Sequence, residues 1–283
     1  MEIIVIGGGI SGRLVQYVVP ESQILDWGRP PGRKSKKLTR MFGANYLWES
    51  LPGIECSKFN VITHVDGREP THETIRRYKE KIGKSFDEDN WDTQFQPIMT
   101  GYDIIDLPES DIRYECRVKE IFRDKKRLLL ASGAQITYDI LVSTIPLYAM
   151  LEMCHIEISR PFSYKPIYIR IEDRPLEAPY PVDTWYVNYL SDPDITPYRF
   201  TDRNGERHYE GLNAMGKIPT RKVIPGKIYP NDQVESAIEE LRDNNIFCFG
   251  RFATWNPEEL LHNTYAGIRH WATDCNLSIN GEL

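Results

Sequence analysis

The amino-acid sequence predicts an α/β protein in which a parallel sheet forms the larger domain and a smaller α+β domain completes the molecule. Two observations support this prediction. The chain opens on an unbroken apolar run, Ile3–Ile6, that passes at once into a glycine-rich turn, and such a run suits a strand buried on both faces. A second apolar run, Ile246–Phe249, is also followed by a glycine. Strands from both ends of the chain are therefore expected in one domain.

Three glycines follow the first strand with the spacing G-x-G-x-x-G, and a helix is expected over 13–19. Gly7 would permit the tight turn, Gly9 the close approach of a pyrophosphate, and Gly12 the close packing of helix on strand. The pyrophosphate would lie at the N-terminus of the helix, beside Ser11, where free N–H groups favour an anion.

An acid at the end of the next expected strand, 23–27, completes the pattern. The carboxylate of Asp26 can accept hydrogen bonds from both ribose hydroxyls of an adenosine, which disfavours a 2′-phosphate. Strand, glycine turn and acid together indicate a Rossmann-like site for a dinucleotide. NAD and FAD proteins share this opening, so the rest of the chain has to distinguish them.

Charge and cysteine content narrow the functional classes. The 283 residues carry a net charge of −6. Six basic residues and no acidic one lie in the stretch 29–40, which leaves −12 for the rest: Arg29, Arg33, Lys34, Lys36, Lys37 and Arg40. The acidic body argues against general nucleic-acid binding, while the basic stretch indicates one anionic contact.

Five scattered cysteines without C-x-x-C spacing indicate reduced thiols and no metal site. The sequence has no run of about 18 apolar residues and no signal-peptide pattern. We therefore expect a cytoplasmic protein, in the host cytoplasm if it is viral.

The middle of the chain indicates how it returns to the first domain. Strands are expected over 114–118 and 127–130, and an apolar strand over 138–146 ends in a Thr-x-Pro turn. This order is typical of two-domain flavoproteins, in which a backbone group near Val118 would meet the adenine. The expected division is a discontinuous FAD-binding domain (1–48, 95–150 and 240–283), a reduced helical insertion (49–94) and a substrate-domain sheet (151–239).

The C-terminal strand leads into Gly250 and Arg251 and then into an expected helix. Asn256 is a suitable N-cap, with Pro257 at the first helical position and Glu259 at the third. A second helix N-terminus would suit the electron-rich edge of an isoalloxazine ring. A nucleotide fold completed by this segment favours FAD, extended along the chain.

Several segments, in order, resemble the UDP-galactopyranose mutase and flavin amine oxidase superfamily. They include the glycine turn and Asp26, and four further runs: Phe42–Trp48, Val187–Tyr189 with Thr196–Arg199, Tyr229–Asp232, and Phe249–Arg251. The resemblance implies a glutathione-reductase type of FAD-binding fold with FAD as cofactor. It places Arg199 beside flavin and substrate phosphate, and puts Asn45 where the family has a histidine in the segment that passes the flavin. Tyr198 is a further candidate at the flavin face, so the expected catalytic residues are Asn45, Tyr198 and Arg199.

The helical insertion that holds the nucleotide sugar in the mutases is reduced here to about 71–83. The resemblance therefore implies first an FAD-dependent oxidoreductase that oxidises a C–N bond of an amine or amino-acid group, with O2 as acceptor. For the basic stretch 29–40 we expect one of two roles: it covers the FAD pyrophosphate, or it contacts a polyanionic substrate. If the basic stretch contacts a polyanionic substrate, the substrate would be an amine-modified nucleotide, such as an amino-acid-modified thymidine in bacteriophage DNA. Two alternatives are a redox-neutral mutase acting on a nucleotide sugar and a non-catalytic FAD-binding protein.

Overall fold

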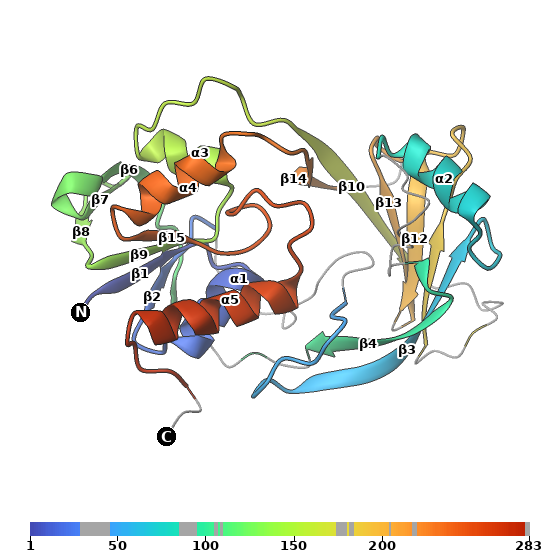
Figure 1. The fold of residues 1–283 in the computed structure, drawn as a ribbon, viewed down its shortest axis with the longest axis horizontal. Helices are drawn as coiled ribbons and strands as arrows, with labels where there is room; N and C mark the ends of the chain where they lie inside the picture. The colour runs from blue at the N-terminus through green and yellow to red at the C-terminus, as the bar shows by residue number, and fades with distance from the viewer. Residues whose placement is uncertain are drawn as a thin grey trace.

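The computed structural model describes residues 1–28, 46–84, 95–104, 107, 110–173, 180, 184–203, 205–216 and 220–280. These residues form two bodies side by side: a parallel sheet flanked by helices, and a larger mixed sheet (Figure 1). No helix in the described ranges is both long enough and apolar enough to span a membrane.

The first body is built on a five-stranded parallel sheet. Its strands stand in the order β15 (Ile246–Cys248), β9 (Ile140–Ser143), β1 (Ile3–Ile6), β2 (Gln23–Leu25) and β5 (Ile112–Arg113). The predicted strand at 3–6 is confirmed, and the chain ends do meet in this sheet. The sheet is consistent with the predicted Rossmann-like class.

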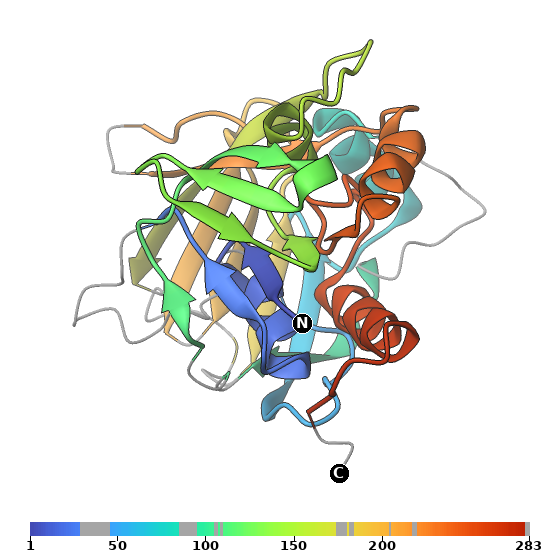
Figure 2. The same cartoon turned by 90° about the vertical axis from the view of Figure 1, so that its left-hand side faces the viewer.

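Helices cover both faces of this sheet because its central strand is apolar on both sides. Ile3 and Val5 face the cluster of α1 (Ile10–Val18) and α5 (Leu261–Asp274), while Ile4 and Ile6 face the opposite cluster. That opposite side holds α3 (Leu147–Met153), α4 (Val234–Arg242) and a three-stranded antiparallel sheet (Figure 2). The small sheet comprises β6 (Val118–Phe122), β7 (Arg127–Leu130) and β8 (Gln135–Thr137), with a 3-10 turn at Arg123–Lys125.

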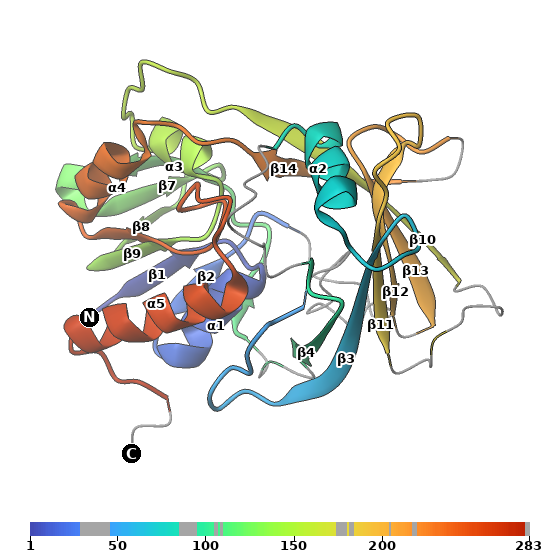
Figure 3. The ribbon, with the colours of Figure 1, turned by 45° about the vertical axis from the view of Figure 1, so that its right-hand side comes forward.

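The second body is a seven-stranded mixed sheet. Its order is β14 (Arg221–Ile228), β10 (Tyr164–Asp173), β13 (Glu206–Gly211), β12 (Pro197–Arg203), β11 (Trp185–Tyr189), β3 (Cys56–Val65) and β4 (Ile98–Ile104). All neighbours are antiparallel except β11 and β3, which are parallel. β10 and β14 lead from the first body into this sheet (Figures 1 and 3).

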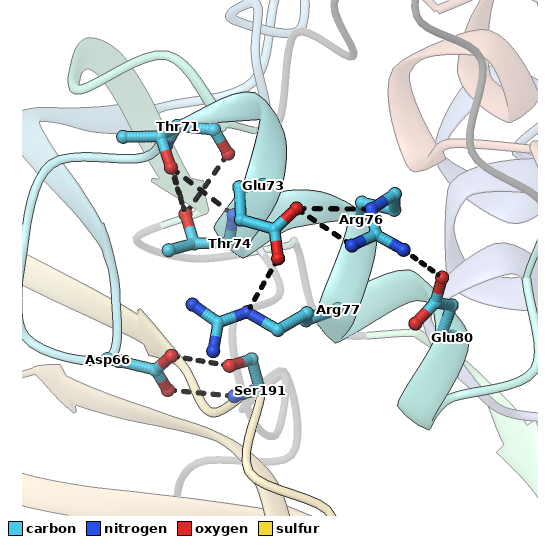
Figure 4. A network of polar contacts seen from close by, with 8 residues as sticks. All are labelled: Asp66, Thr71, Glu73, Thr74, Arg76, Arg77, Glu80 and Ser191. Carbon is cyan, nitrogen blue, oxygen red and sulfur yellow. Dashed lines mark hydrogen bonds and ion pairs between the residues drawn. The ribbon is translucent and has the colours of Figure 1, made fainter.

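One helix, α2 (His72–Lys81), packs on the second sheet, near the predicted insertion 71–83. Thr71 caps it: its side chain accepts from the N–H of Thr74, and the Thr74 hydroxyl accepts in return from the N–H of Thr71 (Figure 4). Arg76 bridges Glu73 and Glu80 on the exposed face. The cap and these pairs favour a helix here despite its low hydrophobicity.

Three predicted segments differ from the structure. The strand expected over 114–118 begins only at 118, because residues 113–116 bond instead to 26–28. β3 and β4 pair in the seven-stranded sheet, whereas β3 was assigned to a helical insertion and β4 to the FAD-binding domain. Alternating side chains of Val61, Thr63 and Val65 are buried, and residues 61–65 pair with β11, so this segment belongs to the sheet. The division into domains otherwise stays a prediction.

Candidate functional site

The glycine turn, Gly7–Gly12, has the geometry that its spacing predicts. Gly7 has φ +108°, and a Cβ there would lie 2.5 Å from Thr144 Oγ1. A Cβ on Gly12 would lie 1.9 Å from the carbonyl oxygen of Gly7, so helix and turn leave no room for a side chain. A Cβ on Gly9 would meet nothing within 4 Å. The backbone at Gly9 is therefore open to a ligand, while Gly7 and Gly12 are required by the protein itself.

The end of β9 holds the glycine turn in place. The Thr144 hydroxyl lies 3.0 Å from the carbonyl oxygen of Ile6 and 3.1 Å from that of Gly7, as donor. The N–H of Thr144 also donates to Ile6 O at 3.0 Å. The Thr-x-Pro return seen in the sequence therefore lies directly beside the glycine turn.

Asp26 lies at the end of β2 and faces the same turn. One carboxylate oxygen accepts from the N–H of Gly8 and the other from the N–H of Gly28, each at 2.5 Å. Each carboxylate oxygen can accept a second hydrogen bond, so Asp26 can also accept from a ribose. Its role in ribose binding stays a prediction.

Two residues near Asp26 were missed by the sequence reasoning. Arg13 is 8% exposed, and its guanidinium donates to Gly8 O and to the hydroxyl of Tyr114, both at 3.3 Å. A buried cation thus lies beside the glycine turn. Trp27 is 71% exposed, and the guanidinium carbon of Arg117 lies 5.0 Å from its ring centroid. Only the unusual arginine after the third glycine and the tryptophan after the ribose acid could have signalled them.

Val118, which was expected near the adenine, begins β6 directly after Arg117. The backbone just before it is tied to the second strand, because the N–H of Cys116 donates to Asp26 O at 2.8 Å. Val118 itself is buried and pairs with Leu130. Its backbone contact with adenine stays a prediction.

The C-terminal turn, Gly250–Glu259, meets the start of α1. Gly250 has φ +93°, and a Cβ there would lie 2.6 Å from Ser11 Oγ. The N–H of Phe249 donates to Ser143 O at 3.0 Å, which fixes the turn at the end of the parallel sheet. Gly250 and Ser11, both predicted for the cofactor, are therefore neighbours in space.

The expected helix start at Asn256 is wrong. α5 begins at Leu261, and the side-chain oxygen of Asn256 accepts from the N–H of Glu258 at 3.0 Å within a local turn. The N–H of Asn256 donates to Arg251 O at 3.0 Å, closing the C-terminal turn on itself. Asn256 favours a tight turn over a helix cap here because its own short-range bonds compete with the helix.

Arg251 lies at the start of the C-terminal turn, and its Nε donates to Glu259 O at 3.1 Å. Arg251 is exposed to solvent, although the surrounding protein atoms remove part of the water around its guanidinium. Burial lowers the pKa of the Arg251 guanidinium; the nearby charge of Glu258 raises it, and that of Arg199 lowers it again. The positive charges of the two predicted arginines, Arg199 and Arg251, therefore repel each other.

Arg199 is held by a carboxylate that the sequence reasoning missed. It lies opposite Glu210 in register on β12 and β13, and its Nη2 donates to both oxygens of Glu210 at 2.7 Å. The Tyr198 hydroxyl donates to Glu210 Oε2 at 3.0 Å. Burial acts to lower the pKa of Arg199, but Glu210 and three tyrosines outweigh it and raise that pKa well above its ordinary value.

Tyr46, which lies within the segment Phe42–Trp48 expected to pass the flavin, adds an aromatic residue to this group. Burial raises the pKa of its hydroxyl; Tyr189 raises it further, and Arg199 lowers it. The guanidinium carbon of Arg199 lies 5.7 Å from the ring centroid of Tyr189. Asn45 and the six basic residues of the stretch 29–40 lie outside the described residues, so their predicted roles stay predictions.

Comparison with known proteins shows the fold. No family model matches the sequence, and no curated protein matches it. A reduced UDP-galactopyranose mutase superposes with a TM-score of 0.62 at 13% identity, covering 98% of this chain and 95% of its own. A putative protoporphyrinogen oxidase from Exiguobacterium sp. 255-15 has a TM-score of 0.56 at 11% identity, covering 97% and 98% respectively. An L-proline dehydrogenase from P. horikoshii has a TM-score of 0.51 at 10% identity, covering 97% and 93%.

Proposed function

We propose that this protein is an FAD-dependent oxidoreductase. The observation that carries the proposal is the meeting of the C-terminal turn with the glycine turn, where Gly250 lies against Ser11. Through this contact, the turn that carries Arg251 lies beside the glycine turn, which holds the open backbone at Gly9 and faces the carboxylate of Asp26. Whole-chain similarity to a protein named an oxidase and one named a dehydrogenase supports redox chemistry on this fold.

The residues present fit FAD. Gly9 leaves space at the N-terminus of α1, where N–H groups and the helix dipole favour a pyrophosphate. Arg13 adds a buried positive charge beside this space. Asp26 keeps acceptor capacity for the ribose hydroxyls, and the C-terminal turn lies against the start of α1, where Gly250 meets Ser11.

The preferred reaction is oxidation of a C–N bond in an amine or amino-acid group. The chemistry that FAD supplies when bound is acceptance of a hydride from the carbon beside the nitrogen, with O2 as final acceptor and peroxide as product. Glu210 neutralises the charge of Arg199. The surroundings of this ion pair therefore suit an amine in its uncharged form, the form in which the carbon beside the nitrogen gives up a hydride. Tyr189 and Tyr198, both buried, and the partly buried Tyr46 supply aromatic surface near Arg199.

The amine belongs either to a small molecule or to a modified nucleotide. An amino-acid-modified thymidine in DNA is the largest substrate of the second kind. A second candidate function is a redox-neutral mutase acting on a nucleotide sugar. The specific observation in its favour is the TM-score of 0.62 to UDP-galactopyranose mutase over nearly the whole of both chains.

The test is a flavin-bleaching panel. FAD is added to the purified protein, the absorption spectrum is recorded, and amines, amino acids and amine-modified oligonucleotides are added without oxygen. Bleaching by an amine, followed by peroxide on admission of air, is the expected result. Activity that appears only after chemical reduction, and only on UDP-sugars, supports the mutase. A protein that takes up no FAD contradicts both functions.

A further inference from the structure

Two lysines stand side by side where the two bodies join. Lys165 on β10 and Lys227 on β14 are direct cross-strand partners. Their ammonium groups lie 6.0 and 5.3 Å from the ring centroid of Tyr229. Like charges directly opposite each other destabilise a sheet, so this arrangement requires a compensating interaction.

A third lysine, Lys84, lies three residues after the end of α2, close enough to act on the charge of Lys227. The Lys227 ammonium donates to the carbonyl oxygen of Ile82, which brings the end of that helix to β14. Burial, followed by the charges of Lys84 and Lys165, lowers the pKa of Lys227 to about 8. The three side chains form one group, called here the lysine cluster.

The described residues offer this cluster little negative charge. Among them, Glu258 is the one carboxylate within 4.0 Å: its Oε1 lies 3.6 Å from Lys84 Nζ. The Glu258 side chain is 80% exposed, and exposed ion pairs contribute little. Within the described residues, this one exposed carboxylate leaves most of the positive charge of the cluster uncompensated.

The cluster borders the proposed flavin site. The indole N–H of Trp255, in the C-terminal turn, donates to Tyr229 O at 2.9 Å. Glu258 belongs to the same turn and acts on the pKa of Arg251 as well as pairing with Lys84. Arg199, expected to meet a substrate phosphate, is held bidentate by Glu210. The lysine cluster is therefore a group of cations beside the proposed flavin site that, unlike Arg199, has no buried carboxylate partner among the described residues.

We propose that Lys84, Lys165 and Lys227 form an anion site for the phosphate group of a small phosphorylated substrate. The inference rests on the proposed function, because it is the amine of this substrate that would face the flavin. Ammonium groups bind phosphate as point charges through charge-assisted hydrogen bonds. Glu258 occupies the edge of the site and competes with the phosphate, so its removal should tighten binding.

The experiment is calorimetric titration of the FAD-saturated protein with pyrophosphate at constant ionic strength. Saturation with FAD keeps the probe away from the glycine turn. The variants are Lys165→Met, Lys227→Met and Glu258→Gln. Lys222→Met is the matched control. Lys222 lies on β14, as Lys227 does, but its ammonium group lies near Tyr168, 5.9 Å from the ring centroid of that tyrosine. Lys165 is exposed, so its variant keeps the test independent of folding.

We expect Lys165→Met and Lys227→Met each to weaken pyrophosphate binding about tenfold, the size of one lost charge-assisted hydrogen bond. Lys222→Met should leave it unchanged, and Glu258→Gln should strengthen it a few-fold. Equal losses in the Lys165 and Lys222 variants would overturn the proposal, since general charge would then explain binding. Absence of pyrophosphate binding to the wild type would also overturn the proposal.

Two further outcomes separate the rival explanations. If single-stranded DNA binding falls in the Lys165 variant while pyrophosphate binding does not, the cluster serves a polyanion and the proposal fails. If the protein takes up no FAD, it is the proposed function that fails, and pyrophosphate titration of the protein without FAD, compared between wild type and the Lys165 variant, still tests the lysine cluster.

Discussion

Arg199 and Glu210 lie opposite each other on β12 and β13 and form a bidentate ion pair, with side chains 17% and 5% exposed. Glu210 also accepts the hydroxyl of Tyr198 at 3.0 Å. The arginine expected to serve the substrate is thus first a structural partner. Because a buried pair costs its desolvation, it stabilises the fold only while both members are present.

Glu210→Gln should therefore destabilise the protein by about 3–5 kcal/mol, since it leaves a buried guanidinium without its counter-charge. Urea unfolding followed by circular dichroism measures this change. The double variant Arg199→Met with Glu210→Met is the control, and it should cost much less, because an apolar pair of similar volume is often nearly neutral. A double variant as unstable as Glu210→Gln would show that packing, and not charge, dominates here.

The glycine turn offers a matched pair of substitutions. Gly12→Ala should destabilise the protein by at least about 1–3 kcal/mol, because its methyl group would lie 1.9 Å from the carbonyl oxygen of Gly7. Gly9→Ala should leave stability nearly unchanged, since its methyl group meets nothing within 4 Å and its φ of −68° suits alanine.

The same Gly9→Ala protein should lose FAD affinity, about tenfold or more, because the methyl group fills the space proposed for the pyrophosphate. Quenching of flavin fluorescence in a titration measures this affinity, and unfolding curves measure stability. A Gly9→Ala protein that binds FAD like the wild type would place the pyrophosphate elsewhere.

How far the sequence predicts the molecule depends on the range of the interactions. The strand at Ile3–Ile6 and the tasks of Gly7 and Gly12 follow from local spacing, which the structure confirms. Asn256 shows where local rules fail: it satisfies the pattern of a helix cap, yet its side chain and backbone close a turn, and the helix starts at Leu261. A helix cap and a tight turn can both use these residues, and the spacing of the sequence alone does not distinguish them.

The partner of Arg199 could have been found from the sequence. Asn204-Gly205 is a two-residue hairpin signal, and Arg203 pairs with Glu206 across it. Counting outward along both strands puts Arg199 opposite Glu210. By contrast, the lysine cluster joins α2 to β10 and β14 across more than one element, and no local pattern places those side chains together.

Lys227 should make stability depend on pH. Its pKa in the folded protein is about 8, against about 10.4 in an unfolded chain. Between these values the unfolded state binds more protons, so the free energy of unfolding rises with pH; below about pH 8 both states are protonated and the cost of the charge is fully present.

Because Lys227 is only half-buried, solvent screening reduces the expected rise between pH 7 and 10 to about 1 kcal/mol. The ionisable side chains of Lys84, Lys165, Tyr229 and Glu258 face the same region, so the measured quantity is the difference in the free energy of unfolding between wild type and Lys227→Met. Denaturant unfolding at both pH values gives it. A difference that stays constant with pH would mean that Lys227 keeps its ordinary pKa.

Trp27 should contact the adenine of FAD. Its ring is 71% exposed, follows Asp26 directly and is covered on one face by Arg117, which leaves the other face for a base. Stacking of a base on an aromatic side chain contributes about 1–3 kcal/mol, so Trp27→Ala should weaken FAD binding about tenfold. FMN lacks the adenosine, and its weaker binding should be unaffected by the same substitution. Trp27→Phe, which keeps a ring, should restore most of the FAD affinity. Equal losses for FAD and FMN would mean that Trp27 acts on the fold of the site and not on the adenine.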